Sequence, residues 1–268
     1  MVEDLTFTSP FPDSPRVLYD NNPLELVICQ LRYPTILRID AEPPAAFQDA
    51  IRGRYPLLRQ TSGPSLPAEL PPEVKALVGR LSPGPAETAY DFTSDDERWT
   101  IGLTRDFIAL TTRRYERWQE FKDRLRELLQ VFAEQYHPAF FGRVGLRYRD
   151  VITPSALGLE GQAWSEMLQP QIAGELVNPQ VAQAAEQCTR ELTLKLEPEG
   201  RVHIQHGIAE RSDTKERTYL IDADFFTEER TSLEDAYNKL DNFNRHAGRL
   251  FRWCITEQLH TALGPNPI

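Results

Sequence analysis

The pattern of apolar and polar positions predicts a series of strands in the first half of the chain. They lie at residues 24–33, 88–93, 98–104 and 107–112. The first is rich in β-forming side chains and ends at Pro34, because proline has no amide hydrogen to donate to a neighbouring strand. In the third, Trp99, Ile101 and Leu103 alternate with polar residues, which indicates a sheet with one face in water.

Two helices are predicted beside these strands. The first covers residues 43–55, where apolar residues recur at helical spacing. The second is long, covers residues 114–136 and places its large apolar residues along one stripe. Between the two helices, prolines recur through residues 56–85 and predict a surface excursion with a helical turn at 72–80.

The second half of the chain repeats this order. Its predicted elements are a strand at 142–152, a helix at 162–176, strands at 191–196, 202–209 and 218–223, and a long helix at 232–263. Gly264-Pro265 ends the last helix. Each half therefore reads β-α-β-β-β-α, and the two halves share this order without convincing sequence identity.

These elements predict an α+β fold, with a mostly antiparallel sheet and two long amphipathic helices on one face. Residues 1–22 are broken by prolines and are predicted to be an extended N-terminal arm. Residues 23–264 are predicted to form one composite domain, because no linker separates the halves at about 23–138 and 139–264.

Composition restricts the classes of partner. The chain has 268 residues, of which 40% are hydrophobic and 26% are charged, as in ordinary globular proteins. Its formal net charge of −10 repels a phosphate backbone, so nucleic acid is disfavoured as a partner unless basic residues cluster locally. The apolar runs are shorter than the roughly 18 residues of a membrane span, and the N-terminus does not read as a signal peptide. We expect a cytoplasmic protein without a membrane partner.

Candidate chemistry is sparse. Cys29, Cys188 and Cys254 are far apart and odd in number, which argues against a disulfide framework or a cysteine metal site. His203 and His206 lie three apart on a predicted strand and so face opposite sides. The sequence signatures of phosphate loops, dinucleotide folds and serine hydrolases are missing. The sequence favours a protein without enzymatic activity or cofactor, and it leaves the question of catalysis open.

The most unusual local feature is a predicted strand that places Arg143, Arg147 and Arg149 on one face. Guanidinium groups in a row repel one another unless anions lie nearby, and they bind phosphate or carboxylate groups in forked pairs. This arginine row is the candidate site for a ligand or partner. The alternative is that acidic side chains of the protein neutralise it in surface ion pairs.

Asp222 and Asp224 share a face at the end of another predicted strand. Paired carboxylates can hold a divalent cation, and these two are weak candidates for a metal site because no third ligand is evident. The alternative, which we favour, is that Asp224 caps the following turn and Asp222 pairs with an arginine of the neighbouring strand. The last predicted helix also carries a basic patch, formed by Arg245, Arg249 and Arg252.

Several phrases of the chain, taken together, resemble a known family. They are PLELVICQLRYP at 23–34, FQDAIRGRYP at 47–56, FTS at 92–94, IGLTRDFIAL at 101–110, YERWQEF at 115–121, RVGLRYRD at 143–150 and YLIDAD at 219–224. The resemblance spans about residues 20 to 264 and is to a sporadically distributed family of uncharacterised bacterial and archaeal proteins. That family has no assigned activity, cofactor or catalytic residue to carry over. Its patchy distribution implies genes that are exchanged on mobile or defence islands.

Three functions stay open. The first, which we favour, is a non-enzymatic accessory or regulatory protein that binds a protein partner in a prokaryotic defence or toxin–antitoxin type of system, since an acidic surface suits a basic partner. The second is a nucleic-acid-binding or metal-dependent nucleic-acid-processing protein that uses Arg143, Arg147 and Arg149. The third is a sensor of an anionic small molecule, which would lie in a pocket between the halves and face the arginine row.

Overall fold

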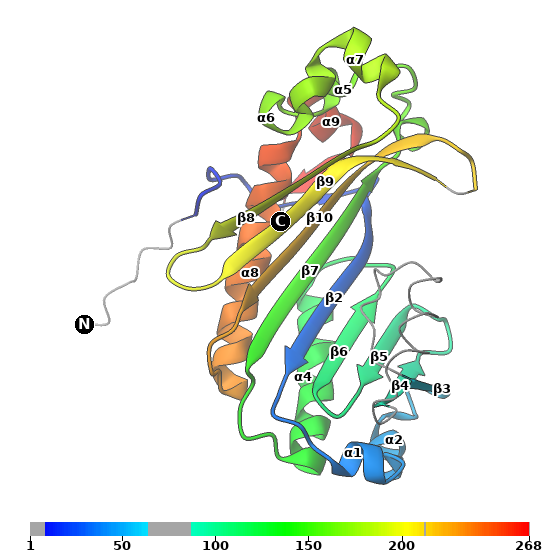
Figure 1. Ribbon diagram of the computed structural model, residues 1–268, viewed down its shortest axis with the longest axis vertical. Coiled ribbons are helices and arrows are strands. Elements are labelled where there is room, and N and C mark those ends of the chain that lie inside the picture. Colours follow the sequence, from blue (N-terminus) through cyan, green and yellow to red (C-terminus); the bar gives the residue numbers. More distant parts are fainter. Residues whose placement is uncertain (1–8, 64–86, 212, 268) are drawn as a thin grey trace.

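The computed structural model describes residues 9–63, 87–211 and 213–267. Within these ranges, one antiparallel sheet has the strand order β3-β4-β5-β6-β2-β7-β10-β9-β8 (Figure 1). Its strands are β2 Leu24–Arg32, β3 Leu57–Gly63, β4 Glu87–Thr93, β5 Trp99–Leu103, β6 Phe107–Thr112, β7 Arg143–Ile152, β8 Cys188–Lys195, β9 Arg201–Glu210 and β10 Arg217–Thr227. A second, small sheet pairs β1 Val17–Tyr19 with β11 Pro265–Pro267. The fold is α+β, as the sequence predicted.

The two halves of the chain meet at the centre of the large sheet. There β2 and β7 run antiparallel, with Cys29 opposite Leu146. From β2 outward the sheet continues with β6, β5, β4 and β3, and from β7 outward it continues with β10, β9 and β8. Each half therefore contributes its first long strand to the middle of the sheet. This arrangement brings residues from both halves of the sequence together at the centre.

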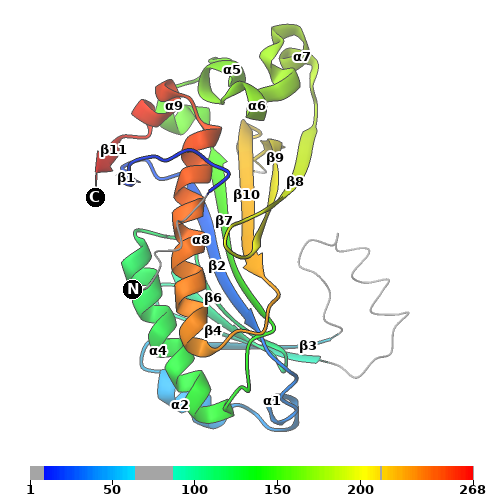
Figure 2. The same ribbon diagram turned by 90° about the vertical axis from the view of Figure 1, so that its left-hand side faces the viewer.

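Two long helices, α4 Trp118–Tyr136 and α8 Leu233–Cys254, cover one face of the sheet (Figure 2). Each carries an apolar stripe at helical spacing, with Phe121 and Phe132 buried on α4 and Leu240 and Phe243 buried on α8. These side chains form one core with the buried residues of the central strands. Burial of apolar surface stabilises by about 25 cal/mol per Å², so this contact is the main force that holds the helices on the sheet.

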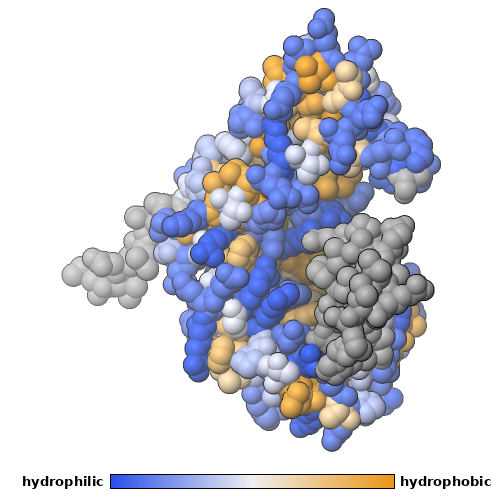
Figure 3. All heavy atoms as spheres, in the orientation of Figure 1, coloured by the Kyte–Doolittle hydropathy of each residue, from blue (hydrophilic) through white to orange (hydrophobic). Residues whose placement is uncertain are grey.

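The opposite face of the sheet has no long helix over its centre in the described part of the chain (Figure 2). Charged side chains lie there, among them Arg143, Arg147 and Asp222. Along β7, Val144 and Leu146 are buried towards the helices, while Arg143, Arg147 and Arg149 alternate with them on the open side. The space-filling view shows hydrophilic surface along the central strands on this side (Figure 3). The strand period of two therefore separates the core from a charged surface.

Residues 57–63 differ from the sequence prediction. They form the edge strand β3, which pairs with β4, whereas we predicted an irregular excursion that begins at residue 56. An ion pair between Arg59 and Asp91, 3.0 Å long, joins the two strands. The density of prolines in the flanking sequence hid this short proline-free run. The helical turn predicted at 72–80 lies outside the described residues.

The prediction of one continuous helix at 162–176 is wrong. The segment consists of short pieces, α5 Trp164–Met167, α6 Pro170–Ala173 and the 3-10 turn η2 Gly174–Val177, and α7 Pro179–Ala184 follows. Pro170 has no amide hydrogen to donate to the preceding turn. Gly174 has a φ of 51°, which ends a right-handed helix. These two residues divide the segment even though its apolar spacing is helical.

The helix predicted at 232–263 is also interrupted. α8 ends at Cys254, Ile255 is extended, and α9 Glu257–Ala262 begins after Thr256. The hydroxyl of Thr256 accepts a hydrogen bond from the backbone N–H of Leu259 at 3.3 Å, which makes it the N-cap of the new helix. The remaining short elements are α1 Arg38–Ala41, η1 Pro154–Leu157 and α2 Ala45–Ile51, the last of which lies inside the helix predicted at 43–55.

The N-terminal arm, residues 9–19, runs beside α8 and ends in β1 (Figure 2). β1 pairs with β11 so that Val17 lies opposite Pro267, which joins the two ends of the described chain. None of the helices in the described ranges is both long and apolar enough to cross a membrane.

Candidate functional site

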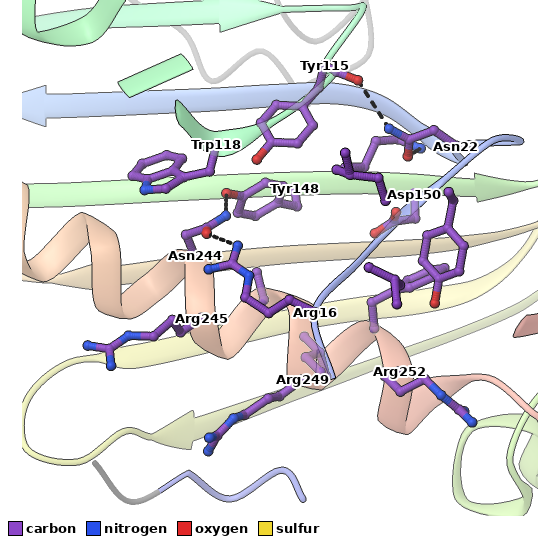
Figure 4. A pocket seen from close by; sticks show the side chains of 18 of the residues that line it. Arg16, Asn22, Tyr115, Trp118, Tyr148, Asp150, Asn244, Arg245, Arg249 and Arg252 are labelled. Carbon is purple, nitrogen blue, oxygen red and sulfur yellow. Dashed lines mark hydrogen bonds between the residues drawn. The ribbon is translucent and has the colours of Figure 1, made fainter. Parts of the chain in front are cut away.

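A cavity of about 590 Å³ lies where the sheet, α8, the start of α4 and the N-terminal arm meet (Figure 4). Its floor is formed by Tyr148 and Asp150 of β7 and by Ile221, Ala223 and Phe225 of β10. Because α4 belongs to the first half of the sequence and α8 to the second, the cavity lies at the junction of the halves. Its size and its mostly apolar and aromatic lining are those of a small-molecule site.

A chain of hydrogen bonds crosses this cavity (Figure 4). Arg16 donates from Nη2 to Oδ1 of Asn244 at 2.5 Å, and Nδ2 of Asn244 donates to Oη of Tyr148 at 2.8 Å. The ring of Tyr148 also meets that of Tyr115 edge to face, with 5.9 Å between their centroids. Burial raises the pKa of Tyr115 to about 12 and holds the pKa of Tyr148 well above its usual value. Both hydroxyls therefore stay protonated and neutral, and they serve as hydrogen-bonding groups rather than bases.

Asp150 is the acidic group on the floor of the cavity. Asp150 is 7% exposed, and its carboxyl group points into the cavity (Figure 4). Burial, and then the negative charge of Asp222 on the adjacent strand, raise the pKa of Asp150 to about 8. Among the residues that the structure describes, none forms a hydrogen bond or ion pair with this carboxyl. A buried acid without a partner is costly in its charged form, and this cost favours the protonated carboxyl.

The N-terminal arm closes one side of the cavity through contacts with α8. Phe11 is buried and packs on Trp253, with 5.5 Å between ring centroids. Asp13 forms an ion pair with Arg249, and Oγ of Ser9 lies 3.1 Å from Nδ1 of His246. The basic patch noted in the sequence therefore lies along this cavity, since Arg249 and its neighbours Arg245 and Arg252 line it.

The arginine row lies on the other face of the sheet. Nε and Nη2 of Arg147 donate to the two carboxylate oxygens of Asp222 at 2.6 and 2.9 Å, and Nε of Arg149 donates to Oδ2 of Asp222 at 2.8 Å. Nη2 of Arg143 donates to Oδ2 of Asp224 at 2.7 Å. The neighbouring strand β10 thus supplies a carboxylate to each member of the row. The cavity of about 590 Å³ lies on the helix side of the sheet, so the arginine row does not line it.

Asp222 and Asp224, the weak metal candidates, are engaged by these guanidinium groups. Asp222 is 3% exposed, and both of its oxygens accept hydrogen bonds from arginine. Within the described ranges, no group of three histidine, cysteine or acidic side chains is placed to hold a metal ion. A cation at Asp222 would therefore have to displace Arg147 and Arg149.

The remaining candidates lie apart from one another. His203 contacts Thr193 at 3.1 Å, and Nδ1 of His206 lies 2.8 Å from the hydroxyl of Tyr219. Burial raises the pKa of the thiols of Cys29 and Cys254, the two buried cysteines. Both thiols stay protonated and unreactive.

Several polar groups of the cavity were not predicted from the sequence. They are Tyr115, Tyr148, Asp150 and Asn244, together with Arg16 of the arm. A signal for two of them was present. Asp150 falls on the apolar side of β7, in phase with Val144 and Leu146, and Asn244 is buried among the apolar positions of α8. A polar residue in phase with core positions requires a partner or a cavity.

The sequence matches no family model and no curated protein. The resemblance to an uncharacterised prokaryotic family is therefore still a prediction.

Proposed function

We propose that this chain is a non-enzymatic protein that binds a small molecule in the cavity between its two halves. The observation that carries the proposal is the buried, unpartnered carboxyl of Asp150 on the floor of an apolar cavity of about 590 Å³. Cavities of roughly 300–1,000 Å³ with few polar groups are the usual sites for small ligands. A ligand that contacts both α4 and α8 would couple the two halves, which suits a sensor.

Binding is favoured over catalysis by the chemistry of the lining. The described residues that line the cavity include no histidine, cysteine or lysine. Tyr115 and Tyr148 are held neutral by their raised pKa. The two tyrosine hydroxyls are therefore poor nucleophiles and poor general bases.

The nucleic-acid alternative has weaker support. Each guanidinium of the arginine row contacts Asp222 or Asp224 at 2.6–2.9 Å. A phosphate would have to compete with these carboxylates, and it would meet a protein of formal net charge −10.

Binding of a protein partner is a second candidate, supported by one observation. β8 forms an edge of the large sheet in the described part of the chain, and its Leu192 is 42% exposed. An edge strand with an exposed leucine can take an added strand from a partner. Mass spectrometry of proteins that co-purify with the tagged chain after nuclease treatment tests this candidate. A stoichiometric protein that is lost in Leu192→Lys would support it, and recovery of the bare chain would contradict it.

The cavity proposal is tested by thermal unfolding against a library of small metabolites and by fluorescence of 8-anilinonaphthalene-1-sulfonate. A ligand at about 100 times its Kd stabilises the folded state by about 2.7 kcal/mol, which raises Tm measurably. Gly248 lies at the cavity on α8, and a Cβ there would meet no atom within 4 Å. Gly248→Phe should therefore fold normally, occupy part of the cavity and lower ligand affinity at least about tenfold.

Gly53→Phe is the matched control. Gly53 is exposed, lies outside the cavity, and also has free space at its Cβ position. It should bind as the parent chain does. If Gly248→Phe and Gly53→Phe bind every ligand found equally well, the cavity is not the site and the proposal is wrong.

A further inference from the structure

Two of the charged groups that line the cavity come from different elements. Asp150 lies on its floor on β7, and Arg16 of the arm points towards Asn244 (Figure 4). In the described part of the chain, Arg16 forms no ion pair with a carboxylate, and it does not reach Asp150 within the 4.0 Å of an ion pair. The carboxyl of Asp150 and the guanidinium of Arg16 thus line the same cavity without pairing with each other, and neither forms an ion pair within the described chain.

Apolar and aromatic side chains line the cavity together with these two groups. Ile221, Ala223 and Phe225 lie below it, and Tyr19 and Phe251 line it from the arm and α8. Burial raises the pKa of Tyr19 to about 12, so this ring is neutral. Neutral aromatic faces attract an ammonium group, and Asp150 would supply its counter-charge.

We infer that the ligand is a two-ended molecule, with a basic nitrogen that contacts Asp150, an apolar body, and an anionic group that lies at Arg16. This inference rests on the proposed function and names its ligand class. The anionic end can be a carboxylate or a phosphate, since a guanidinium binds both in forked pairs. A ligand without the nitrogen leaves Asp150 unpaired, and one without the anion leaves Arg16 to solvent.

The bound nitrogen would change the state of Asp150. A cation within about 4–6 Å favours the ionised carboxyl and lowers its pKa from about 8. Binding at pH 7 then releases a proton, and affinity for the amine rises as pH increases from 6 to 8. A ligand without a basic nitrogen gives no such rise.

The test uses 12-aminododecanoate and two relatives that each lack one end, dodecanoate and dodecylamine. Affinities come from calorimetry at pH 7.5 with the full chain. We expect 12-aminododecanoate to bind at least about tenfold more tightly than either relative. Asp150→Asn should weaken the two amines about tenfold and leave dodecanoate within about twofold. Arg16→Gln should weaken 12-aminododecanoate and dodecanoate and leave dodecylamine unchanged. An ω-amino alkyl phosphate in place of the carboxylate identifies the preferred anion.

Failure of this inference is distinguishable from failure of the proposed function. If dodecanoate binds as tightly as 12-aminododecanoate and Asp150→Asn changes neither, the inferred ligand class is wrong. If that binding is lost in Gly248→Phe, the cavity is still the binding site and the proposed function stands. Absence of binding by all three probes at millimolar concentration overturns the inference, and the metabolite library then decides separately on the proposed function. Asp150→Asn is checked for folding by thermal unfolding.

Discussion

Asp150 makes stability depend on pH in an unusual direction. Its folded-state pKa of about 8 lies above the ordinary value for a carboxyl, so the folded chain binds more protons than the unfolded chain between about pH 4 and 8. Its contribution is therefore complete below about pH 4 and is lost as pH rises towards 8. The groups that act on it from the packed elements are Asp222 on β10, Tyr19 on β1 and Cys254 on α8.

Asp150→Asn tests this dependence directly. The difference in free energy of unfolding between the variant and the parent should grow in favour of the variant from pH 4 to 8 and stay constant above. Urea unfolding at five pH values measures it, and other titrating groups cancel in the difference. A difference that is constant across this range would mean that the carboxyl titrates normally.

His246 makes stability depend on pH in the opposite direction. It is buried, and desolvation, followed by the charges of Arg249 and Arg245, lowers its pKa to about 4. The unfolded chain therefore binds more protons between pH 4 and 6.5, and the stability contributed by neutral His246 is lost as pH falls through this window. His246→Gln should flatten the acid side of the stability profile. An unchanged slope between pH 6.5 and 4 in urea unfolding would contradict the assignment.

Asp222 should contribute more to the free energy of unfolding than Asp224 does. It is 3% exposed and neutralises both Arg147 and Arg149, whereas the side chain of Asp224 is 30% exposed. Removing one charge of a buried ion pair costs about 3–5 kcal/mol, and removing an exposed one costs about 1 kcal/mol or less. We expect Asp222→Asn to show the larger loss in chemical unfolding, with Asp224→Asn as its matched control. Equal losses would show that burial does not separate the two carboxylates.

At the scale of elements, strands were predicted more reliably than helices. Alternation of apolar and polar residues marks a strand locally. The predicted ends of β5, β6 and β7 therefore agree with the observed ends within one residue. Helical spacing does not reveal a break, and Pro170, Gly174 and Thr256 divide segments that we predicted as continuous. The arm was predicted as extended, but its contacts with α8 depend on pairs more than 200 positions apart, which the sequence does not indicate.

The arm is expected to detach from α8 more easily than the rest of the fold unfolds. Phe11→Ala removes the buried ring that packs on Trp253. This should make the attachment of the arm to α8 less favourable by about 3 kcal/mol. Hydrogen exchange should then increase at the amides of β1 and remain unchanged in β7. Pro12→Ala, at an exposed neighbouring position, is the control. Increased exchange throughout the central sheet would show that the arm is part of the global fold instead.

At the scale of the whole molecule, the α+β class and an antiparallel sheet were predicted, whereas β3, which adds a strand to the order predicted for the first half, and the order of the strands within the sheet were not. Two β-α-β-β-β-α orders can combine in several ways, and the adjacency of β2 and β7 is a long-range outcome of packing. The cavity depends on that adjacency, because its floor comes from one half and part of its side from the other. For this reason Arg143, Arg147 and Arg149 stood out in the sequence while Asp150 and Asn244 did not.

The separation of Ser9 from His246, 237 positions along the chain, has a consequence for biosynthesis. A growing chain completes β2, β7 and β10 before α8 has left the ribosome. At that stage the apolar side chains of Tyr148, Ile221 and Phe225 are exposed to solvent, and the arm lacks the helix on which it packs. The nascent protein is therefore vulnerable to aggregation until α8 emerges and covers this surface.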